Sequence, residues 1–306
     1  MVLKVRRGVV ILTVKFTWTA TQNVLLKSFL QKQGVSRRLL AKLKYHGGQI
    51  KVNNHQCTVR YQLEPGDQVT IVLPKEGKQE IIEPISQPID ILYEDEHLIA
   101  VNKPAGYTSI PSQYNPQGSM ANILKAYYQH RDYDDQMIHV ITRLDRDTSG
   151  IMLFARHRFA HAMMDQILQK KEISRQYIAF NRKKLPEVHG FIEAPITRKT
   201  GSIIERQVGP EGKYALTEYQ FDQEAAGINR YRVKLHTGRT HQIRVHFAYQ
   251  GAPLLGDELY GGQPWQGLNR QALHCHQLSF IHPFTQHPLT IEAPLANDLS
   301  QLGFNI

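Results

Sequence analysis

The sequence predicts an α+β fold, in which a mixed, largely antiparallel sheet with flanking helices follows a small α/β domain. From Ile89 onward, short apolar strands alternate with turn residues and with few helical segments, which is not typical of a doubly wound sheet. Before that point, two helical segments precede several short strands. The stretch 74–88 is polar and punctuated by prolines. We therefore expect domains at 1–80 and 89–306, joined by a linker at 81–88.

The composition indicates a soluble globular protein in a reducing compartment. The chain is 41% hydrophobic and 21% charged. No apolar run approaches the ~20 residues that span a bilayer. The apolar run at 9–14 is short, and no small-residue cleavage site follows it, so a first strand is favoured over a signal peptide. Cys57 and Cys275 are far apart in the sequence and form no disulfide framework. We expect a cytoplasmic protein.

The excess positive charge is concentrated in the first quarter of the chain. Residues 1–80 contain fourteen Lys and Arg against four Asp and Glu, whereas residues 81–306 contain twenty-three of each class. The whole net charge of +10 therefore belongs to the first domain. A basic domain attached to a neutral one suggests a polyanion-binding module that serves another activity.

Cap and turn residues divide the first domain into helices and strands. Thr21 can cap a helix that ends at Gly34, and Ser36 can cap a second helix that ends at Gly47. Short strands are expected at 9–16, 49–53, 56–61 and 68–73.

The second of these helices has an apolar face and a cationic face. Helical spacing places Leu39, Leu40 and Leu43 together. The opposite face carries the cationic stripe, which consists of Arg37, Arg38, Lys42 and Lys44. An ordinary solvated face is the alternative, but such a face usually mixes signs, and no acidic residue occurs between positions 22 and 61. The stripe therefore favours a phosphate backbone as its partner.

The second domain combines short strands with two helices. A hairpin is expected around 94–96, and helices are expected at 120–129 and 159–168, the second with methionines that belong to the core. Further strands are expected at 137–141, 151–155, 172–180, 214–221 and 231–235.

The loop at 141–150 joins two of these strands and is the strongest candidate site. Its Asp, Thr, Ser and Gly residues are turn formers, and loops held by a rigid pair of strands often carry chemistry. A two-residue repeat presents Arg143 and Asp145 on one side and anchors Leu144 on the other. For the loop alone, a solvated hairpin turn is the alternative.

Several motifs in the right order resemble one enzyme family. The motif RLDRDTSG at 143–150 resembles the catalytic motif of the RluA/RluD family of large-subunit ribosomal and tRNA pseudouridine synthases. VNKPAG at 101–106 resembles the motif that opens their catalytic domain, and GRTHQIRVH at 238–246 resembles their late motif. Gly256-Asp257 with Tyr260-Gly261, and Leu273-His274 with His282-Pro283, also fit. Thr142 stands where the family usually has histidine.

Residues 20–73 carry a second resemblance. The segments GVSRR at 34–38, GQIKVN at 48–53 and PGDQV at 65–69 resemble the alpha-L RNA-binding domain of the small-subunit ribosomal protein S-four. That domain frequently accompanies the synthase family, so the first domain is expected to bind RNA.

The resemblance implies an RNA isomerase without a cofactor, for which a single carboxylate is the minimum equipment. It assigns that role to Asp145, which can attack the sugar, or stabilise or deprotonate it as the glycosidic bond breaks. It makes Arg244 the neighbouring cation and Tyr177 the ring that stacks on uracil. Arg143 matches the residue that helps to displace the target base from folded RNA, and Ile243 is expected to pack under the base.

Each of these residues also has an ordinary structural alternative. Asp145 could cap its own turn, Tyr177 could be a core tyrosine with a hydrated hydroxyl group, and Arg244 could form a plain salt bridge. A non-catalytic RNA-binding or ribosome-associated protein with a decayed site is the second hypothesis. A hydrolase that releases the base is the third.

A metal site is not expected. The histidines at 236, 241 and 246 are five residues apart, a spacing that aligns on neither a helix nor a strand, and the cluster at 274–276 has no paired cysteine. The expected partner is structured RNA, ribosomal RNA more than tRNA, bound by a monomer.

Overall fold

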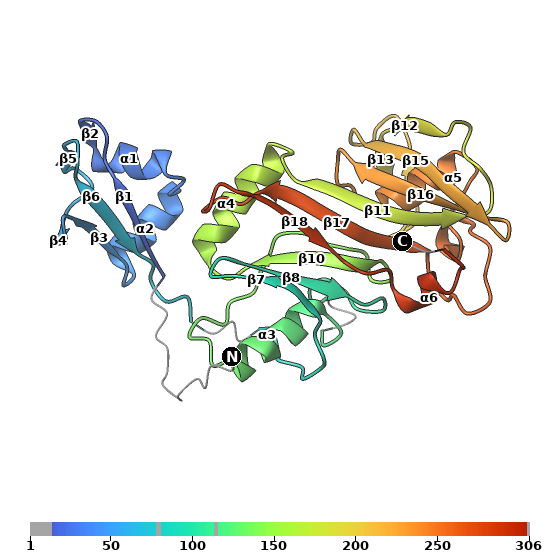
Figure 1. Ribbon diagram of the computed structural model, residues 1–306, viewed down its shortest axis with the longest axis horizontal. Coiled ribbons are helices and arrows are strands. Elements are labelled where there is room, and N and C mark those ends of the chain that lie inside the picture. Colours follow the sequence, from blue (N-terminus) through green and yellow to red (C-terminus); the bar gives the residue numbers. More distant parts are fainter. Residues whose placement is uncertain (1–13, 78–80, 113–115, 305–306) are drawn as a thin grey trace.

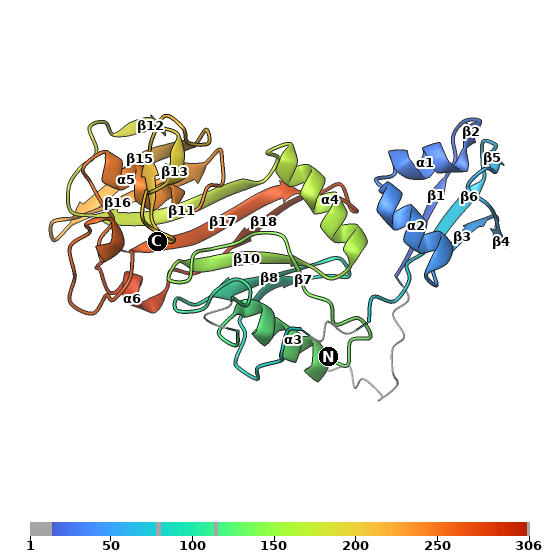
Figure 2. The same cartoon turned by 180° about the vertical axis from the view of Figure 1, so that it is seen from behind.

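The computed structural model describes residues 14–77, 81–112 and 116–304. A small unit near the N-terminus stands beside α4, and β12, β13, β15 and α5 lie at the opposite end of the molecule (Figures 1 and 2). The large unit between them is built on one extended sheet.

The small unit packs two helices on a four-stranded sheet. The strand order is β1-β6-β3-β4, and all pairs are antiparallel. A further antiparallel pair joins β2 to β5. The strands are β1 (Lys15–Thr19), β2 (Val24–Leu25), β3 (Gln49–Val52), β4 (His55–Gln56), β5 (Gln62–Leu63) and β6 (Gln68–Val72). The helices are α1 (Leu26–Lys32) and α2 (Arg37–Tyr45).

The second helix of the small unit forms as predicted. The Ser36 hydroxyl accepts a hydrogen bond from the Leu39 amide at 3.2 Å, so it caps α2. Gly47 follows with φ +83°, a conformation that favours glycine after a helix. The apolar face, Leu39, Leu40 and Leu43, is buried in the core of the unit.

Two predictions for the small unit were wrong, and a third falls partly outside the described residues. The first helix begins at Leu26 and not near Thr21, because Val24 and Leu25 pair with β5. The amides of Leu26 and Lys27 donate to the carbonyls of Tyr61 and Val59, so no side chain caps this helix. The same contacts turn the chain away after Gln56, and the strand expected at 56–61 ends there. Of the strand expected at 9–16, Lys15 and Phe16 lie in β1, and positions 9–13 lie outside the described residues.

The large unit contains a ten-stranded mixed sheet, as the sequence predicts. Its order is β12-β15-β16-β11-β17-β10-β8-β7, with β18 added to β17 and β9 added to β10. Among the described strands, β10 and β17 form the parallel pair, and the other pairs are antiparallel. The strands are β7 (Ile91–Glu94), β8 (Leu98–Lys103), β9 (His139–Val140), β10 (Ser149–Ala155), β11 (Ser174–Asn181), β12 (His189–Glu193), β15 (Leu216–Ala225), β16 (Ile228–Leu235), β17 (Leu273–Ile281) and β18 (Pro288–Glu292).

Helices and a small hairpin complete the large unit. They are α3 (Met120–His130), α4 (Arg158–Gln169), α5 (Gln242–Tyr249), the 3₁₀ helix η1 (Glu258–Tyr260), α6 (Asn297–Ser300), and the hairpin of β13 (Ile196–Arg198) with β14 (Arg206–Val208). The helices expected at 120–129 and 159–168 are confirmed. Met164 lies in the main core, and Met163 is half-buried against the small unit. No helix in the described part of the chain is long and apolar enough to cross a membrane.

The two units share a packed boundary. Phe159 of α4 belongs to the core of the small unit, and Phe16 of β1 stacks on Phe284 with ring centroids 5.1 Å apart. After β6, the carboxylate of Glu76 lies 2.9 Å from Arg158 and 3.1 Å from His139. The segment that leaves the small unit is therefore held against the large one. We propose that the domain boundary falls after this contact, close to the expected linker.

Candidate active site

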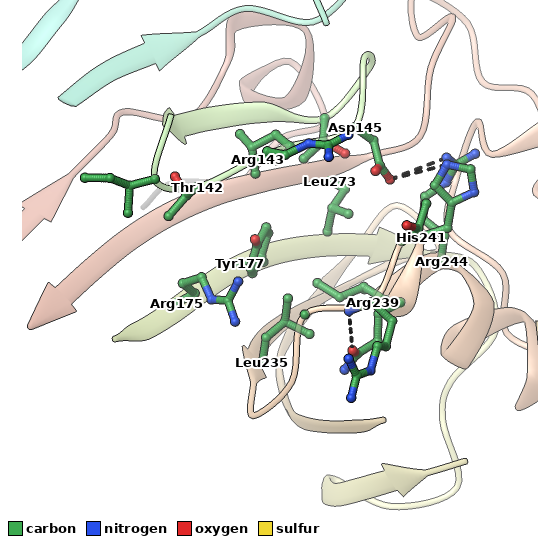
Figure 3. Close-up of a pocket in the computed structure, with 17 residues that line it drawn as sticks. Thr142, Arg143, Asp145, Arg175, Tyr177, Leu235, Arg239, His241, Arg244 and Leu273 are labelled. Carbon is green, nitrogen blue, oxygen red and sulfur yellow. Dashed lines mark hydrogen bonds and ion pairs between the residues drawn. The ribbon is translucent and has the colours of Figure 1, made fainter. Parts of the chain in front are cut away.

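The loop at 141–148 leaves β9 and returns as β10, and its backbone is fixed on both sides. Leu144 is buried in the main core, whereas Arg143 is exposed. The Ser109 hydroxyl donates to the Leu144 carbonyl at 2.8 Å and accepts from its amide at 3.0 Å. The predicted alternation is confirmed at Leu144, and Asp145 is presented to a cavity beside the loop (Figure 3).

A buried lysine supports the far side of the loop. The Lys103 ammonium donates to the carbonyls of Pro104, Tyr107 and Arg146 at 2.8, 2.8 and 2.7 Å. Burial lowers the pKa of Lys103 to about 7. The strand VNK of the motif at 101–106 thus holds the chain just after Asp145.

Thr142 fixes the near side of the loop. Its side chain is buried, and its hydroxyl accepts a hydrogen bond from the Leu153 amide of β10 at 2.9 Å. Its own amide donates to the Leu153 carbonyl at 3.1 Å. The residue that departs from the family motif therefore makes a backbone contact that anchors the loop.

The end of the loop requires a glycine. Gly150 has φ +109°, and a Cβ there would lie 2.2 Å from the carbonyl oxygen of Cys275 on β17. This close approach belongs to the parallel pairing of β10 with β17. The preceding Ser149 hydroxyl lies 2.9 Å from His274 Nδ1 and 3.1 Å from Arg270.

The carboxylate of Asp145 faces two side chains from the turn and helix that follow β16. Arg244 Nη1 lies 3.6 Å and His241 Nε2 lies 3.9 Å from Asp145 Oδ2 (Figure 3). Arg244 is fixed by Asp257, which accepts two hydrogen bonds of 2.7 Å from its Nε and Nη2. The ring of Tyr260 lies 5.0 Å from the guanidinium centre.

His241 is the second neighbour of this carboxylate. Burial lowers the pKa of His241, and the charge of Arg244 acts in the same direction, whereas Asp145 opposes the shift. Its Nδ1 lies 2.7 Å from the Tyr260 hydroxyl. Its backbone has φ +59°, in the left-handed region, where α5 begins.

The cavity beside Asp145 has a volume of about 290 Å³. Its apolar lining includes Tyr177 of β11, Ile243 of α5 and Leu273 of β17. Burial raises the pKa of Tyr177 well above 10, so its hydroxyl stays protonated. A protonated ring and two aliphatic side chains form an apolar wall opposite a charged one, which suits a flat polar ligand.

The structure brings the predicted site residues together. Arg143, Asp145, Tyr177, Ile243 and Arg244 come from three separate segments, the loop, β11 and α5, and all line this cavity. The cationic stripe lies elsewhere, on α2 of the small unit, where Lys42 is half-buried and the other three residues are exposed. Within the described ranges, no group of three His, Cys, Asp or Glu side chains is placed to hold a metal ion.

Four residues of the site were given no role by the sequence. Asp257, Tyr260 and His241 were noticed as parts of motifs, and His241 also as a metal candidate. Arg175 of β11 also lines the cavity, two residues from Tyr177. The spacing of Arg175 and Tyr177 along one strand is the signal that could have identified it, since alternate residues share a face.

Comparison with known proteins defines the class of this site. The family model described as RNA pseudouridylate synthase matches residues 97–249, which include the loop, β11 and α5. The structure of human RNA pseudouridylate synthase domain containing 4 superposes with a TM-score of 0.58 at 20% identity, over 70% of this chain and 91% of that one. This likeness shows a shared fold.

Sequence relatives extend the match to most of the chain. An uncharacterized RNA pseudouridine synthase of Bacillus subtilis, YjbO, is 43% identical over 277 residues, or 90% of this chain and 97% of its own. Ribosomal large subunit pseudouridine synthase D of Escherichia coli is 35% identical over 267 residues, or 83% of this chain and 81% of its own. The chain belongs to the RluA/RluD family of RNA pseudouridine synthases and is an isomerase that converts uridine to pseudouridine.

Proposed function

We propose that this enzyme isomerises specific uridines in structured RNA, with Asp145 as the catalytic carboxylate. One observation carries the assignment: Asp145 is the carboxylate that faces the cavity, and it lies 3.6 Å from a buried arginine. Several relatives are named ribosomal large subunit pseudouridine synthases, which supports large-subunit ribosomal RNA as the substrate. We expect the enzyme to bind this RNA as a monomer.

The reaction needs little beyond a placed carboxylate. The bond from ribose C1′ to the uracil ring nitrogen breaks, the base rotates, and a ring carbon bonds to C1′. The carbon loses a proton and the nitrogen gains one, so no oxidant or energy donor is consumed. Asp145 either attacks the sugar or assists its rearrangement as the bond breaks. Arg244 stabilises the negative charge on Asp145, and Asp257 keeps Arg244 in position.

The cavity holds the detached base. Its volume, about 290 Å³, is at the lower end of the ~300–1,000 Å³ usual for ligand pockets, which suits one nucleoside. Tyr177 stacks on the uracil and Ile243 packs beneath it. Arg143, which is exposed at the entrance, helps to displace the base from the RNA and fills its place.

The small unit serves as the RNA-docking module. The cationic stripe, Arg37, Arg38, Lys42 and Lys44, is on the solvent side of α2 and contacts the phosphate backbone. The packed boundary with α4 holds this module at a fixed place relative to Asp145. Because the distance between the small unit and Asp145 is fixed, the enzyme selects RNA in which the docked element and the target uridine are the same distance apart.

Pseudouridine mapping by carbodiimide labelling and primer extension tests this proposal. Total RNA is compared from cells with the gene, without it, and with Asp145→Asn. We expect the same one or few sites to vanish in both deficient strains. Asp165→Asn, on the exposed face of α4, makes the same chemical change far from the cavity and should retain every site. Full modification in the Asp145→Asn strain would overturn the catalytic assignment.

The two alternatives give different results in the same system. A non-catalytic RNA-binding protein predicts no change in the map, with or without the gene, and no product from purified protein on transcribed RNA. A hydrolase predicts free uracil in the reaction mixture and an abasic site in place of pseudouridine.

A further inference from the structure

A second cavity opens directly beside the active site. Its volume is about 550 Å³, and it lies between the start of β11, the end of β16 and the turn that follows α4. Arg175, Leu235, Gly238 and Arg239 line both cavities, so the two adjoin along one wall. A ligand that fills the first cavity can therefore continue into the second one.

The lining of this second cavity is strongly basic. Lys171, Arg175, Lys234 and Arg239 line it, and Glu172 is the one carboxylate among the lining residues. In the part of the chain that the structure describes, Lys171, Lys234 and Arg175 have no carboxylate within 4.0 Å. Lys234 lies across from Glu218 on β15 without a close ion pair. An excess of cations around a concave surface attracts a polyanion.

Arg175 is the most constrained of these cations. Its Nε is buried and has no hydrogen-bond partner among the described residues. In Figure 3 its side chain extends from β11 next to Tyr177, at the wall that the two cavities share. Buried donors are almost always paired, and because this nitrogen is enclosed, a ligand in the cavity would meet the guanidinium group through its terminal nitrogens. A phosphate oxygen is the usual acceptor for a guanidinium group in this setting.

An exposed aromatic side chain lines the same cavity. Tyr214 is 48% exposed, and its carbonyl accepts a hydrogen bond of 2.9 Å from Arg239 Nε. Solvent-exposed aromatic rings beside cations are the common platform for an unpaired base. The second cavity thus offers one group for a phosphate and another for a base.

We propose that the second cavity binds the nucleotide that adjoins the target uridine. Arg175 contacts the phosphate that links the two nucleotides, and the neighbouring base stacks on Tyr214, with Lys234 near its outer phosphate. This inference rests on the proposed function and deepens it, because it makes the enzyme sensitive to the nucleotide next to its target.

The first test uses variants of this cavity on a transcript that contains the uridine identified by mapping. Arg175→Gln and Tyr214→Ala are each expected to lower kcat/KM by about 10- to 100-fold, as for loss of a charge-assisted hydrogen bond or of base stacking. Lys183→Gln and Tyr249→Ala change an exposed lysine and an exposed tyrosine outside both cavities, and should leave kcat/KM unchanged. Wild-type kcat/KM in both cavity variants would overturn the proposal.

The second test separates a phosphate contact from a merely structural role of Arg175. A synthetic segment is ligated into the transcript with an uncharged methylphosphonate on the 5′ or the 3′ side of the target uridine. On one side, the substitution should slow the wild type and should slow Arg175→Gln no further, because the contact is already lost. Equal slowing of both proteins at both positions would refute the phosphate contact.

These outcomes are distinct from failure of the proposed function. If the wild type forms no pseudouridine in the unmodified transcript, the proposed function itself fails, and this inference fails with it. If the wild type is active, and the methylphosphonate slows the wild type and Arg175→Gln equally, only the assignment of the second cavity fails.

Discussion

Arg244 has two acidic neighbours, and their geometry differs in a way that assigns each a task. Asp257 is almost fully buried and makes two short hydrogen bonds to the guanidinium group, whereas Asp145 is 27% exposed and stands 3.6 Å away. Asp257 therefore fixes the arginine, and Asp145 remains open to the cavity. A guanidinium group fixed in advance stabilises charge without reorganising during the reaction.

Replacing Asp257 should impair catalysis as well as stability. Asp257→Asn removes the charge that balances buried Arg244, a change that costs about 3–5 kcal/mol in comparable buried pairs. We expect a lower melting temperature and a kcat reduced by roughly 10- to 100-fold in the protein that remains folded. Asp222→Asn, which breaks the ion pairs to Arg230 and Arg232 on the outer strands, should lower stability with little change in kcat. Equal kcat values for the two variants would contradict this role.

Thr142 should tolerate only substitutions that keep its hydroxyl. Thr142→Val preserves the shape but removes the acceptor for the Leu153 amide. Loss of such a buried partner costs about 1–3 kcal/mol, and the loop that carries Asp145 loosens. Thr142→Ser keeps the acceptor and serves as the control. Thermal unfolding and single-turnover rates of both variants check this, and a Val variant as stable and active as the Ser variant would contradict it.

At the level of elements, α4 joins the two units and depends on a histidine cap. His157 Nδ1 accepts from the Ala160 amide at 3.1 Å, and its Nε2 lies 3.0 Å from His97 Nδ1. Burial lowers the pKa of His157 to about 3, and the neighbouring His97 acts in the same direction. Nδ1 of His157 must be unprotonated to accept from the Ala160 amide, and one of the two histidine nitrogens must be unprotonated in the second contact. The start of α4 is therefore sensitive to acid.

The cap predicts a defined loss of stability at low pH. His157 binds its proton near pH 6.5 when unfolded and near pH 3 when folded. Because the unfolded chain takes up the proton first, stability should fall as pH drops from 6.5 toward 3, by up to roughly 1.4 kcal/mol per pH unit. His157→Asn keeps a capping side chain without this titration. Urea unfolding between pH 7 and 4 should show a shallower decline for the variant, and parallel curves would refute the assignment.

The helix α5 shows where prediction from sequence reaches its limit. Residues 242–247 are all buried, so the helix has no apolar stripe that a periodicity could reveal. By contrast, α2 and α4 each have a solvent face and were predicted within a residue or two. The helix α3 was predicted equally well although residues 120–126 are buried, and the Ser119 side chain caps its start. The ends of strands were harder to predict, because pairing with residues distant in the sequence determines where a strand begins or ends, as at Val24 and Gln56.

The candidate site also has features that the sequence predicted and features that it did not. The motifs predicted the residues that line the cavity, since short-range sequence carries that information. The bidentate contact of Asp257 with Arg244 and the contact of Tyr260 with His241 depend on how η1 folds against α5, which no local pattern encodes. The second cavity depends on three stretches, 168–175, 214–216 and 234–239, of which the motifs cover only Gly238 and Arg239.

At the scale of the whole molecule, the two units carry different functional features. The small unit carries the excess positive charge, and the large unit carries the cavity. The shared boundary at Phe16, Phe159 and Phe284 holds them together. RNA affinity and chemistry should therefore respond to different mutations.

The salt dependence of RNA binding tests this division. Arg37→Gln combined with Lys44→Gln removes two exposed cations of the stripe and should lower the slope of log K against log salt by roughly 0.7–0.9 per lost contact. The turnover of bound RNA should stay near that of the wild type. Arg182→Gln with Lys183→Gln removes the same two residue types from the large unit and should leave the slope unchanged. Equal slopes for both double variants would count against docking through α2.

The central claim is that Asp145 performs the chemistry and is not needed for RNA binding. The direct measurement is a single-turnover assay combined with a binding titration on one RNA, for the wild type and Asp145→Asn. We predict that product formation falls to the detection limit in the variant while Kd changes less than about threefold, because one exposed contact contributes little to a large interface. Appreciable product from Asp145→Asn, or loss of binding equal to the loss of activity, would contradict the account.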